Sequence, residues 1–151
     1  MLAVVRPDSW NFPLLLHVLG AMLLVGSLLF VSITLVGAWR SGSAALVRSG
    51  ANVLLVAVIP SYLLMRLAAE WIVSKEHLKD AHLSWLDIGF TTADLGALLI
   101  IVATAITGFG VRRINRGAAE PGVGVRIATV LVAVLVVAYL VAIWAMTTKP
   151  T

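Results

Sequence analysis

The chain has 151 residues, 61% of them hydrophobic and 12% charged, and its mean hydropathy is +1.05. These values lie far from those of soluble globular domains and indicate a protein built for lipid. The net charge of +4 comes from basic residues that separate long apolar runs, so it is interpreted as a topology signal and not as a nucleic-acid-binding surface. The lack of cysteine excludes disulfides, iron–sulfur clusters and thiolate-ligated haem.

Four apolar segments are long enough to cross a membrane as helices. A spanning helix needs about 20 mainly apolar residues, because the hydrocarbon core is about 30 Å thick. Continuous runs favour helices over the alternating strands of a membrane barrel, and the first run is too long for a cleaved signal peptide. We therefore expect an all-α membrane protein, a bundle of four transmembrane helices in one domain over residues 1–151, with spans at 12–39, 53–73, 86–111 and 127–146.

Two of these segments have notable local features. The second contains Pro60, which lacks an N–H donor and is expected to kink the helix. Residues 41–52, before this span, are either a small-residue connection or an inward extension of the second helix. The fourth span has no charged residue, and its polar groups are limited to Thr129, Tyr139 and Trp144. We expect it to form a lipid-facing wall or a docking surface.

Arginine is concentrated in two short connections, those between the first and second spans and between the third and fourth. Cytoplasmic loops of membrane proteins carry an excess of Lys and Arg. We therefore predict a multi-pass protein of the cell (cytoplasmic) membrane in the N-out/C-out orientation, with both of these loops inside. The six arginines are Arg40, Arg48, Arg112, Arg113, Arg116 and Arg126.

Ionisable side chains inside two of the spans are the strongest functional signal. At about 1.5 Å per residue, Arg66 and Asp94 come out roughly 12–14 Å below the outer boundary, on helices adjacent in sequence. Charges in a bilayer are costly, so they usually pair and face the bundle interior. Glu70 lies one turn outward from Arg66, and Tyr62 extends the same stripe inward. We predict that Arg66 and Asp94 are in contact.

Two further groups of side chains fall at similar depth. Asp87, Thr91 and Asp94 form an i, i+4, i+7 stripe on the third span. His17 on the first span lies at about the depth of Glu70. These residues are expected to line one outward-opening pocket together with Tyr62 and Arg66. The alternative is purely structural, in which the charged pair only holds two helices together.

The opening of the first span is similar to a known family. The segment Leu14-Leu15-Leu16-His17-Val18-Leu19-Gly20-Ala21-Met22-Leu23-Leu24-Val25-Gly26 resembles the first span of small bacterial membrane proteins related to the four-helix domain of the copper-resistance protein D type. The resemblance implies a cytoplasmic-membrane bundle, with haem or copper handling in some relatives. It carries over only His17 as a candidate haem or metal ligand. Independently of the resemblance, His77 and His82 lie on the same predicted side of the membrane and are candidates for a second ligand.

Two hypotheses for function follow. In the first, a non-enzymatic membrane protein binds a small polar or anionic ligand or a proton in an outer-leaflet pocket, or acts as a small subunit of a larger membrane complex. The residues of that pocket are His17, Tyr62, Arg66, Glu70, Asp87, Thr91 and Asp94. No cofactor is predicted for it, and its partners are the lipid bilayer and either a second copy or a larger complex, not nucleic acid. The alternative is a haem-binding electron-transfer or oxidoreductase component that uses His17. No nucleotide-binding or catalytic-triad pattern is found, which favours the non-enzymatic hypothesis.

Overall fold

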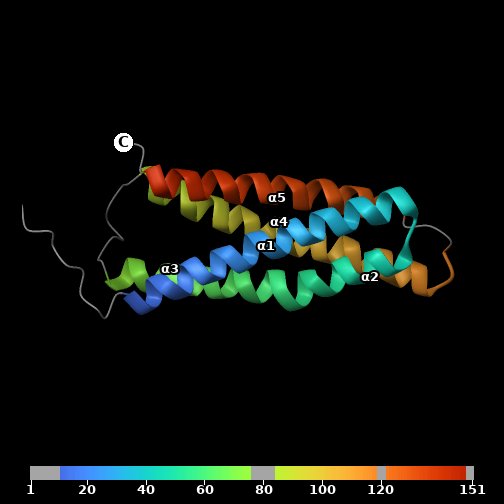
Figure 1. The fold of residues 1–151 in the computed structure, drawn as a ribbon, viewed down its shortest axis with the longest axis horizontal. Helices are drawn as coiled ribbons and strands as arrows, with labels where there is room; N and C mark the ends of the chain where they lie inside the picture. The colour runs from blue at the N-terminus through green and yellow to red at the C-terminus, as the bar shows by residue number, and fades with distance from the viewer. Residues whose placement is uncertain (1–10, 76–83, 119–121, 149–151) are drawn as a thin grey trace, which may run out of the picture.

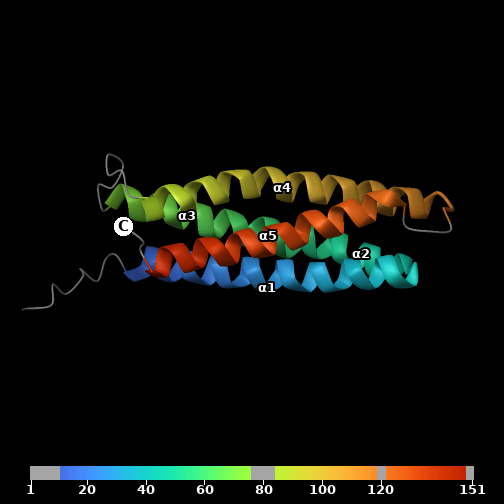
Figure 2. The same ribbon diagram turned by 90° about the horizontal axis from the view of Figure 1, so that it is seen from above.

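The computed structural model describes residues 11–75, 84–118 and 122–148, and every element in these ranges is helical. Figures 1 and 2 show an elongated bundle, and four helical passes follow its long axis. The first residues of α1 and the last of α5 lie at one end, which we call the terminal end (Figure 1). The opposite end is called the arginine end. The elements are α1 (Asn11–Ser41), α2 (Ala44–Val53), η2 (Leu54–Val58), α3 (Ile59–Lys75), α4 (Ser84–Asn115) and α5 (Val123–Thr148).

Each of the four passes has the length and apolar composition of a membrane span. They run over Asn11–Ser41, Ala44–Lys75, Asp87–Asn115 and Val123–Thr148, so each expected span is present and extends beyond its apolar run. Polar residues at the helix ends continue the backbone hydrogen-bond pattern outside the apolar stretch. The all-helical, four-span architecture predicted from the sequence is confirmed for the described residues.

The connection between the first and second passes is only two residues long. Gly42 adopts a φ of +67°, a left-handed conformation that glycine tolerates, and its N–H donates to the carbonyl of Ala38 at 2.9 Å. Ser43 then caps α2, because its hydroxyl accepts a hydrogen bond from the N–H of Leu46 at 3.5 Å. The segment after this turn therefore extends the second helix inward, which was one of the two alternatives for residues 41–52.

The second pass is irregular directly before Pro60. Residues Leu54–Val58 form a π-helical turn, and the N–H of Ile59 bonds to the carbonyl of Leu54, five residues earlier. A wider turn of this kind changes the backbone pairing next to a residue that has no N–H to donate. The structure thus has a π turn directly before Pro60, within one continuous pass from Ala44 to Lys75, and the kink expected there stays a prediction.

The helices pack unevenly around a core of aliphatic side chains. Helix α1 packs against α3 and α5, and α5 packs along α4. Helix α4 also contacts α2, whereas it barely touches α3. Gly20 permits the close approach of α1 to α3, since a Cβ there would lie 2.6 Å from the backbone nitrogen of Met65. Fully buried core side chains include Leu24, Leu28, Leu35, Leu54, Ile100 and Leu135.

Helix α5 differs from the lipid-facing wall expected of the fourth span. One face is exposed and apolar, as at Val137, but the opposite face is buried in the bundle and carries Val132, Leu135 and Tyr139. The reason is the interhelical packing, because α5 lies between α1 and α4 and contributes to the core along both. Large apolar side chains exposed on all four passes, including Met22, Val56, Ile101 and Val137, complete a surface suited to lipid.

Candidate functional site

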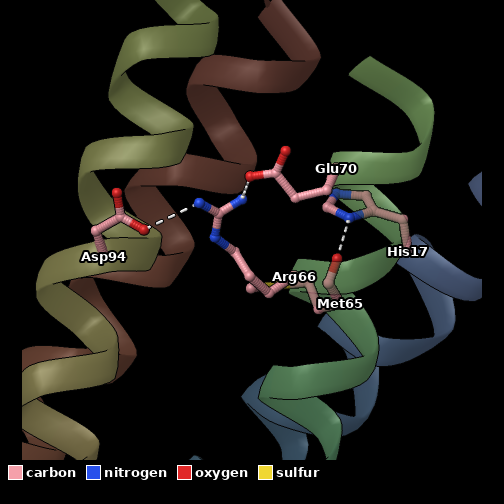
Figure 3. A network of polar contacts seen from close by, with 5 residues as sticks. All are labelled: His17, Met65, Arg66, Glu70 and Asp94. Carbon is pink, nitrogen blue, oxygen red and sulfur yellow. Dashed lines mark hydrogen bonds and ion pairs between the residues drawn. The ribbon is translucent and has the colours of Figure 1, made fainter. Parts of the chain in front are cut away.

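Arg66 on α3 connects two helices near the terminal end (Figure 3). Its Nη1 donates a hydrogen bond to Oε1 of Glu70, one turn further along α3, and its Nη2 donates to Oδ1 of Asp94 on α4 at 3.2 Å. The Arg66 guanidinium carbon also lies 4.6 Å from the centroid of the Phe90 ring, a cation–π distance. The predicted contact between Arg66 and Asp94 is therefore present, with Glu70 as a third member of the cluster.

This cluster lies where the bundle is otherwise weakly joined. Because α3 and α4 barely touch, the contacts of Arg66 with Asp94 and Phe90 are a main connection between them. The side chain of Arg66 is 22% exposed and that of Asp94 is 65% exposed, so the bridge lies at the bundle surface with its cation on the inner side. Because both residues lie within apolar helices of spanning length, the exposed side of this pair is not expected to face water, and the pairing offsets the cost of a lone charge in a bilayer.

His17 on α1 is held by the backbone of α3. Its Nδ1 lies 3.0 Å from the carbonyl oxygen of Met65 (Figure 3). A carbonyl oxygen can only accept, so in the neutral imidazole Nδ1 carries the proton and Nε2 retains a free lone pair. The close packing of α1 on α3 at Gly20 brings the two helices within reach for this bond. The fold thereby fixes both the position of the ring and the nitrogen available to a ligand.

A partly open cavity of about 60 Å³ lies beside His17 and Arg66, between α1, α3, α4 and α5. Most of its wall is apolar, and its polar groups come from three different helices. We call it the His17–Tyr139 cavity after two of those residues. The side chains that define it include His17, Ala21, Met65, Arg66, Phe90, Ala93, Tyr139 and Ala142.

Tyr139 lines this cavity and carries an unusual hydroxyl group, which packs against α4. The residue is 4% exposed, and its hydroxyl makes no hydrogen bond with the described part of the chain. Gly96 on α4 makes room for it, because a Cβ at that position would collide with the hydroxyl. Buried polar atoms are nearly always hydrogen-bonded, so an unpaired one is unusual. This hydroxyl faces Gly96, which does not line the cavity, and therefore belongs to the packing of α4 against α5.

The seven candidate residues divide between the cavity and the bundle surface. His17 and Arg66 line the cavity as the structure describes it. Tyr62 is partly buried in the packing near the cluster, close enough to interact electrostatically with Arg66. The other four are exposed, on α3 or on α4: Glu70, Asp87, Thr91 and Asp94. One pocket containing all seven side chains is therefore not formed.

The rotation of α4 explains this difference. Its cavity-facing side carries Gly89, Phe90 and Ala93, and Phe90 and Ala93 directly precede Thr91 and Asp94 in the sequence. Small residues on that side let α5 approach closely. The stripe of Asp87, Thr91 and Asp94 is turned outward as a result. Sequence spacing identified the residues that share a face, but it did not identify the direction of that face.

Tyr139 and Phe90 are the residues that sequence analysis did not assign to the site. In the sequence, Phe90 is an ordinary apolar residue of a span, and its spacing from Arg66 does not predict a cation–π contact. Tyr139 carried a weak signal, since a phenol in a span without charged residues usually finds a polar partner or a polar environment. Its position across from Gly96 depends on the packing of α4 against α5.

The metal and haem predictions depend on histidine. Within the described ranges, no group of three or more His, Asp or Glu side chains is placed to hold a metal ion. His17 is suited to serve as a single ligand through Nε2, whereas His77 and His82 lie outside the described residues.

Comparisons of the chain with protein-family models, with curated proteins and with solved structures found no match. The fold nevertheless defines a class, because four apolar helices of spanning length are the architecture of a multi-pass helical membrane protein.

Proposed function

We propose that this membrane protein binds a small molecule in the His17–Tyr139 cavity and is not an enzyme. The observation that carries the proposal is the partly open cavity itself, which brings the polar side chains of His17 and Arg66 to one space. Both stand in an otherwise apolar wall, the composition typical of ligand sites. His17 also keeps Nε2 free, because its Nδ1 bonds the Met65 carbonyl.

The proposed orientation places the cavity in the outer half of the membrane. The arginine end of the bundle carries Arg40, Arg112 and Arg126, and the excess of arginine there supports a cytoplasmic location for that end. The terminal end then faces outward, in the N-out/C-out topology of a cytoplasmic-membrane protein. A ligand would reach the cavity from the outer leaflet or the outer aqueous phase, near the space between α3 and α4 that Arg66 spans.

The test is to fill the cavity without disturbing the rest of the bundle. Ala142 is buried at the cavity wall, so Ala142→Leu occupies part of the space that a ligand would use. Val141→Leu is the matched control, because the neighbouring side chain on α5 is exposed to lipid. Wild type and both variants, reconstituted in nanodiscs, would be screened by thermal unfolding against a panel of small neutral, anionic and cationic compounds.

A ligand at about 100 times its Kd stabilises a folded protein by about 2.7 kcal/mol. We expect at least one compound to raise the unfolding temperature of wild type and of the Val141→Leu variant but not that of the Ala142→Leu variant. If every stabilising compound acts equally on all three proteins, binding does not involve the cavity and the proposal is wrong.

Haem binding is the second candidate function, and the orientation of His17 favours it. The bond from Nδ1 to the Met65 carbonyl leaves Nε2 free, as in histidines that ligate haem iron or metals. The chain would then hold the iron through one imidazole. An absorption spectrum of the purified protein separates the candidates. The ligand-binding proposal predicts no Soret band, whereas a stoichiometric Soret band that is lost in His17→Ala would establish the alternative.

A further inference from the structure

The arginine end of the bundle carries an excess of positive charge. Residues 40–52 and 112–126 contain six arginines and one acidic residue, Glu120, which lies outside the described residues, so the excess is five charges. Within the described ranges, none of the six arginines forms an ion pair. Arg48 donates a hydrogen bond to Oδ1 of Asn115 at 2.8 Å, but this neutral partner leaves its charge uncompensated. This end of the molecule is therefore an electrostatic match for anions.

A groove opens on the bundle surface beside this charge. It has a volume of about 190 Å³ and lies between α4 and the beginning of α5. Its residues on α4 recur at i, i+3, i+4 and i+7 and so share one helical face: Ile106, Phe109, Gly110 and Arg113. This face extends about 10 Å along the helix axis, from an apolar end at Ile106 to a charged end at Arg113. We call it the Arg113 groove.

Glycine keeps the Arg113 groove open on its α5 side. Gly122 and Gly124 line it there, and neither has a side chain to fill it. A Cβ at Gly124 would lie 3.2 Å from Cγ2 of Ile106, and a Cβ at Gly122 would lie 2.6 Å from Nη1 of Arg113. The second distance places the guanidinium of Arg113 directly beside the start of α5, at the polar end of the groove.

Arg112 brings a second cation to this end. Its guanidinium carbon lies 6.0 Å from the centroid of the Phe109 ring, and Phe109 is an exposed residue of the groove wall. Guanidinium groups stay charged, and they bond phosphate oxygens through two parallel N–H donors. A phosphate is thus the anionic group that the polar end of the groove is best suited to hold.

A phospholipid combines both chemistries of the groove. Its phosphate meets the arginines, and the first part of an acyl chain lies along the apolar end, within a helix of spanning length. Free phosphate would leave the apolar end empty, and a zwitterionic headgroup would add a cation beside the arginines. Membrane orientation accounts for arginines at this end, but it does not require a groove next to one of them.

We propose that the Arg113 groove binds one anionic phospholipid, with the phosphate on Arg113 and an acyl chain along Ile106 and Phe109. In the proposed orientation this lipid comes from the cytoplasmic leaflet. The groove is separate from the His17–Tyr139 cavity, because the two share no lining residue, and its lipid is independent of the ligand proposed there.

The experiment uses the full chain in phosphatidylcholine nanodiscs that contain a small fraction of a photoreactive lipid. Two such lipids are compared, phosphatidylglycerol and phosphatidylcholine, each with a diazirine on the acyl chain close to the glycerol. Labelled peptides are identified by mass spectrometry, and specific labelling is the part that excess unlabelled phosphatidylglycerol removes. Inorganic phosphate is the second competitor, compared with sodium chloride of equal ionic strength.

We expect photoreactive phosphatidylglycerol to label groove residues specifically, and photoreactive phosphatidylcholine to label them about 5-fold less, the effect of one charge contact at a membrane surface. Arg113→Gln should reduce the specific labelling by a similar factor. Arg40→Gln is the matched control, because it removes an exposed arginine from the same end of the bundle, in the last turn of α1 and outside the groove. It should change labelling by less than about 2-fold, since its charge is screened at a distance.

The outcomes distinguish a lipid site from the general properties of this end. Equal labelling by the two lipids would mean that bulk lipid coats the groove, and equal losses in Arg113→Gln and Arg40→Gln would mean diffuse attraction to the whole arginine end. Either result, or the absence of specific labelling in the groove, overturns the proposal. Displacement by inorganic phosphate beyond that by sodium chloride would assign the groove to a free anion instead.

Discussion

Replacing Tyr139 by phenylalanine is expected to stabilise the ligand-free protein. The substitution removes one oxygen atom and leaves the ring, so the packing of α5 against α4 is retained. Tyr139 is 4% exposed and its hydroxyl lacks a partner among the described residues. A buried donor without a partner costs about 1–3 kcal/mol. Removing the hydroxyl should therefore raise the free energy of unfolding by about 1 kcal/mol or more.

The measurement is reversible unfolding in mixed micelles, with far-UV circular dichroism as the readout, after exhaustive exchange to remove bound small molecules. Tyr62→Phe is the matched control, since the same oxygen is removed from the chain's other tyrosine, which is only partly buried. Its free energy of unfolding should fall or stay unchanged, because that hydroxyl interacts with Arg66. A loss of about 1 kcal/mol in Tyr139→Phe would mean that the hydroxyl is hydrogen-bonded in the empty protein, and the argument from an unpaired group would fail.

Three other expectations concern the bridge, the helix packing and the topology. Arg66→Leu and Asp94→Asn should each lower the unfolding free energy, because each leaves charge less well paired inside a span, and the double variant should lower it by less than their sum, whereas strict additivity would show no energetic coupling between the two residues. Gly20→Ala should destabilise the protein by about 1–3 kcal/mol, because the new methyl group meets the α3 backbone. Gly26 has open space around it, so Gly26→Ala should stabilise the protein by about 0.5–1 kcal/mol. Equal effects of the two substitutions would contradict the close approach of α1 to α3. Ala118→Cys, in a chain with no native cysteine, should react with a membrane-impermeant thiol reagent only after the cells are permeabilised, and labelling of intact cells would reverse the proposed orientation.

Much of the bridge could be predicted from the sequence. Depth in a membrane span follows from residue number, because each helical residue advances a fixed distance along the axis. Arg66 and Asp94 have matching depths on consecutive spans, and their contact at 3.2 Å follows from that match and from the cost of an unpaired charge. Glu70 joins them through ordinary i, i+4 spacing on α3.

The cavity could not be predicted in the same way. Its existence depends on how far each helix is rotated about its axis, and hydropathy contains little information on rotation when almost every side chain is apolar. The stripe of Asp87, Thr91 and Asp94 illustrates this limit, since its members share a face as expected but the face is exposed. The hydrogen bond from His17 to a backbone carbonyl is equally invisible in the sequence, because every residue has such a carbonyl.

The sequence by itself predicted that the helices are suited to lipid, how many helical passes there are, and how far along its helix each charged group lies. These properties depend on local composition and on a constant helical rise. Only the tertiary structure decided which groups meet around a common space. Gly20 and Gly96 set the approach of α1 to α3 and of α4 to α5, and those approaches place His17 and Tyr139 at one cavity. The physical reason is that close packing between helices depends on the shape of both surfaces together, which no single segment of the sequence specifies.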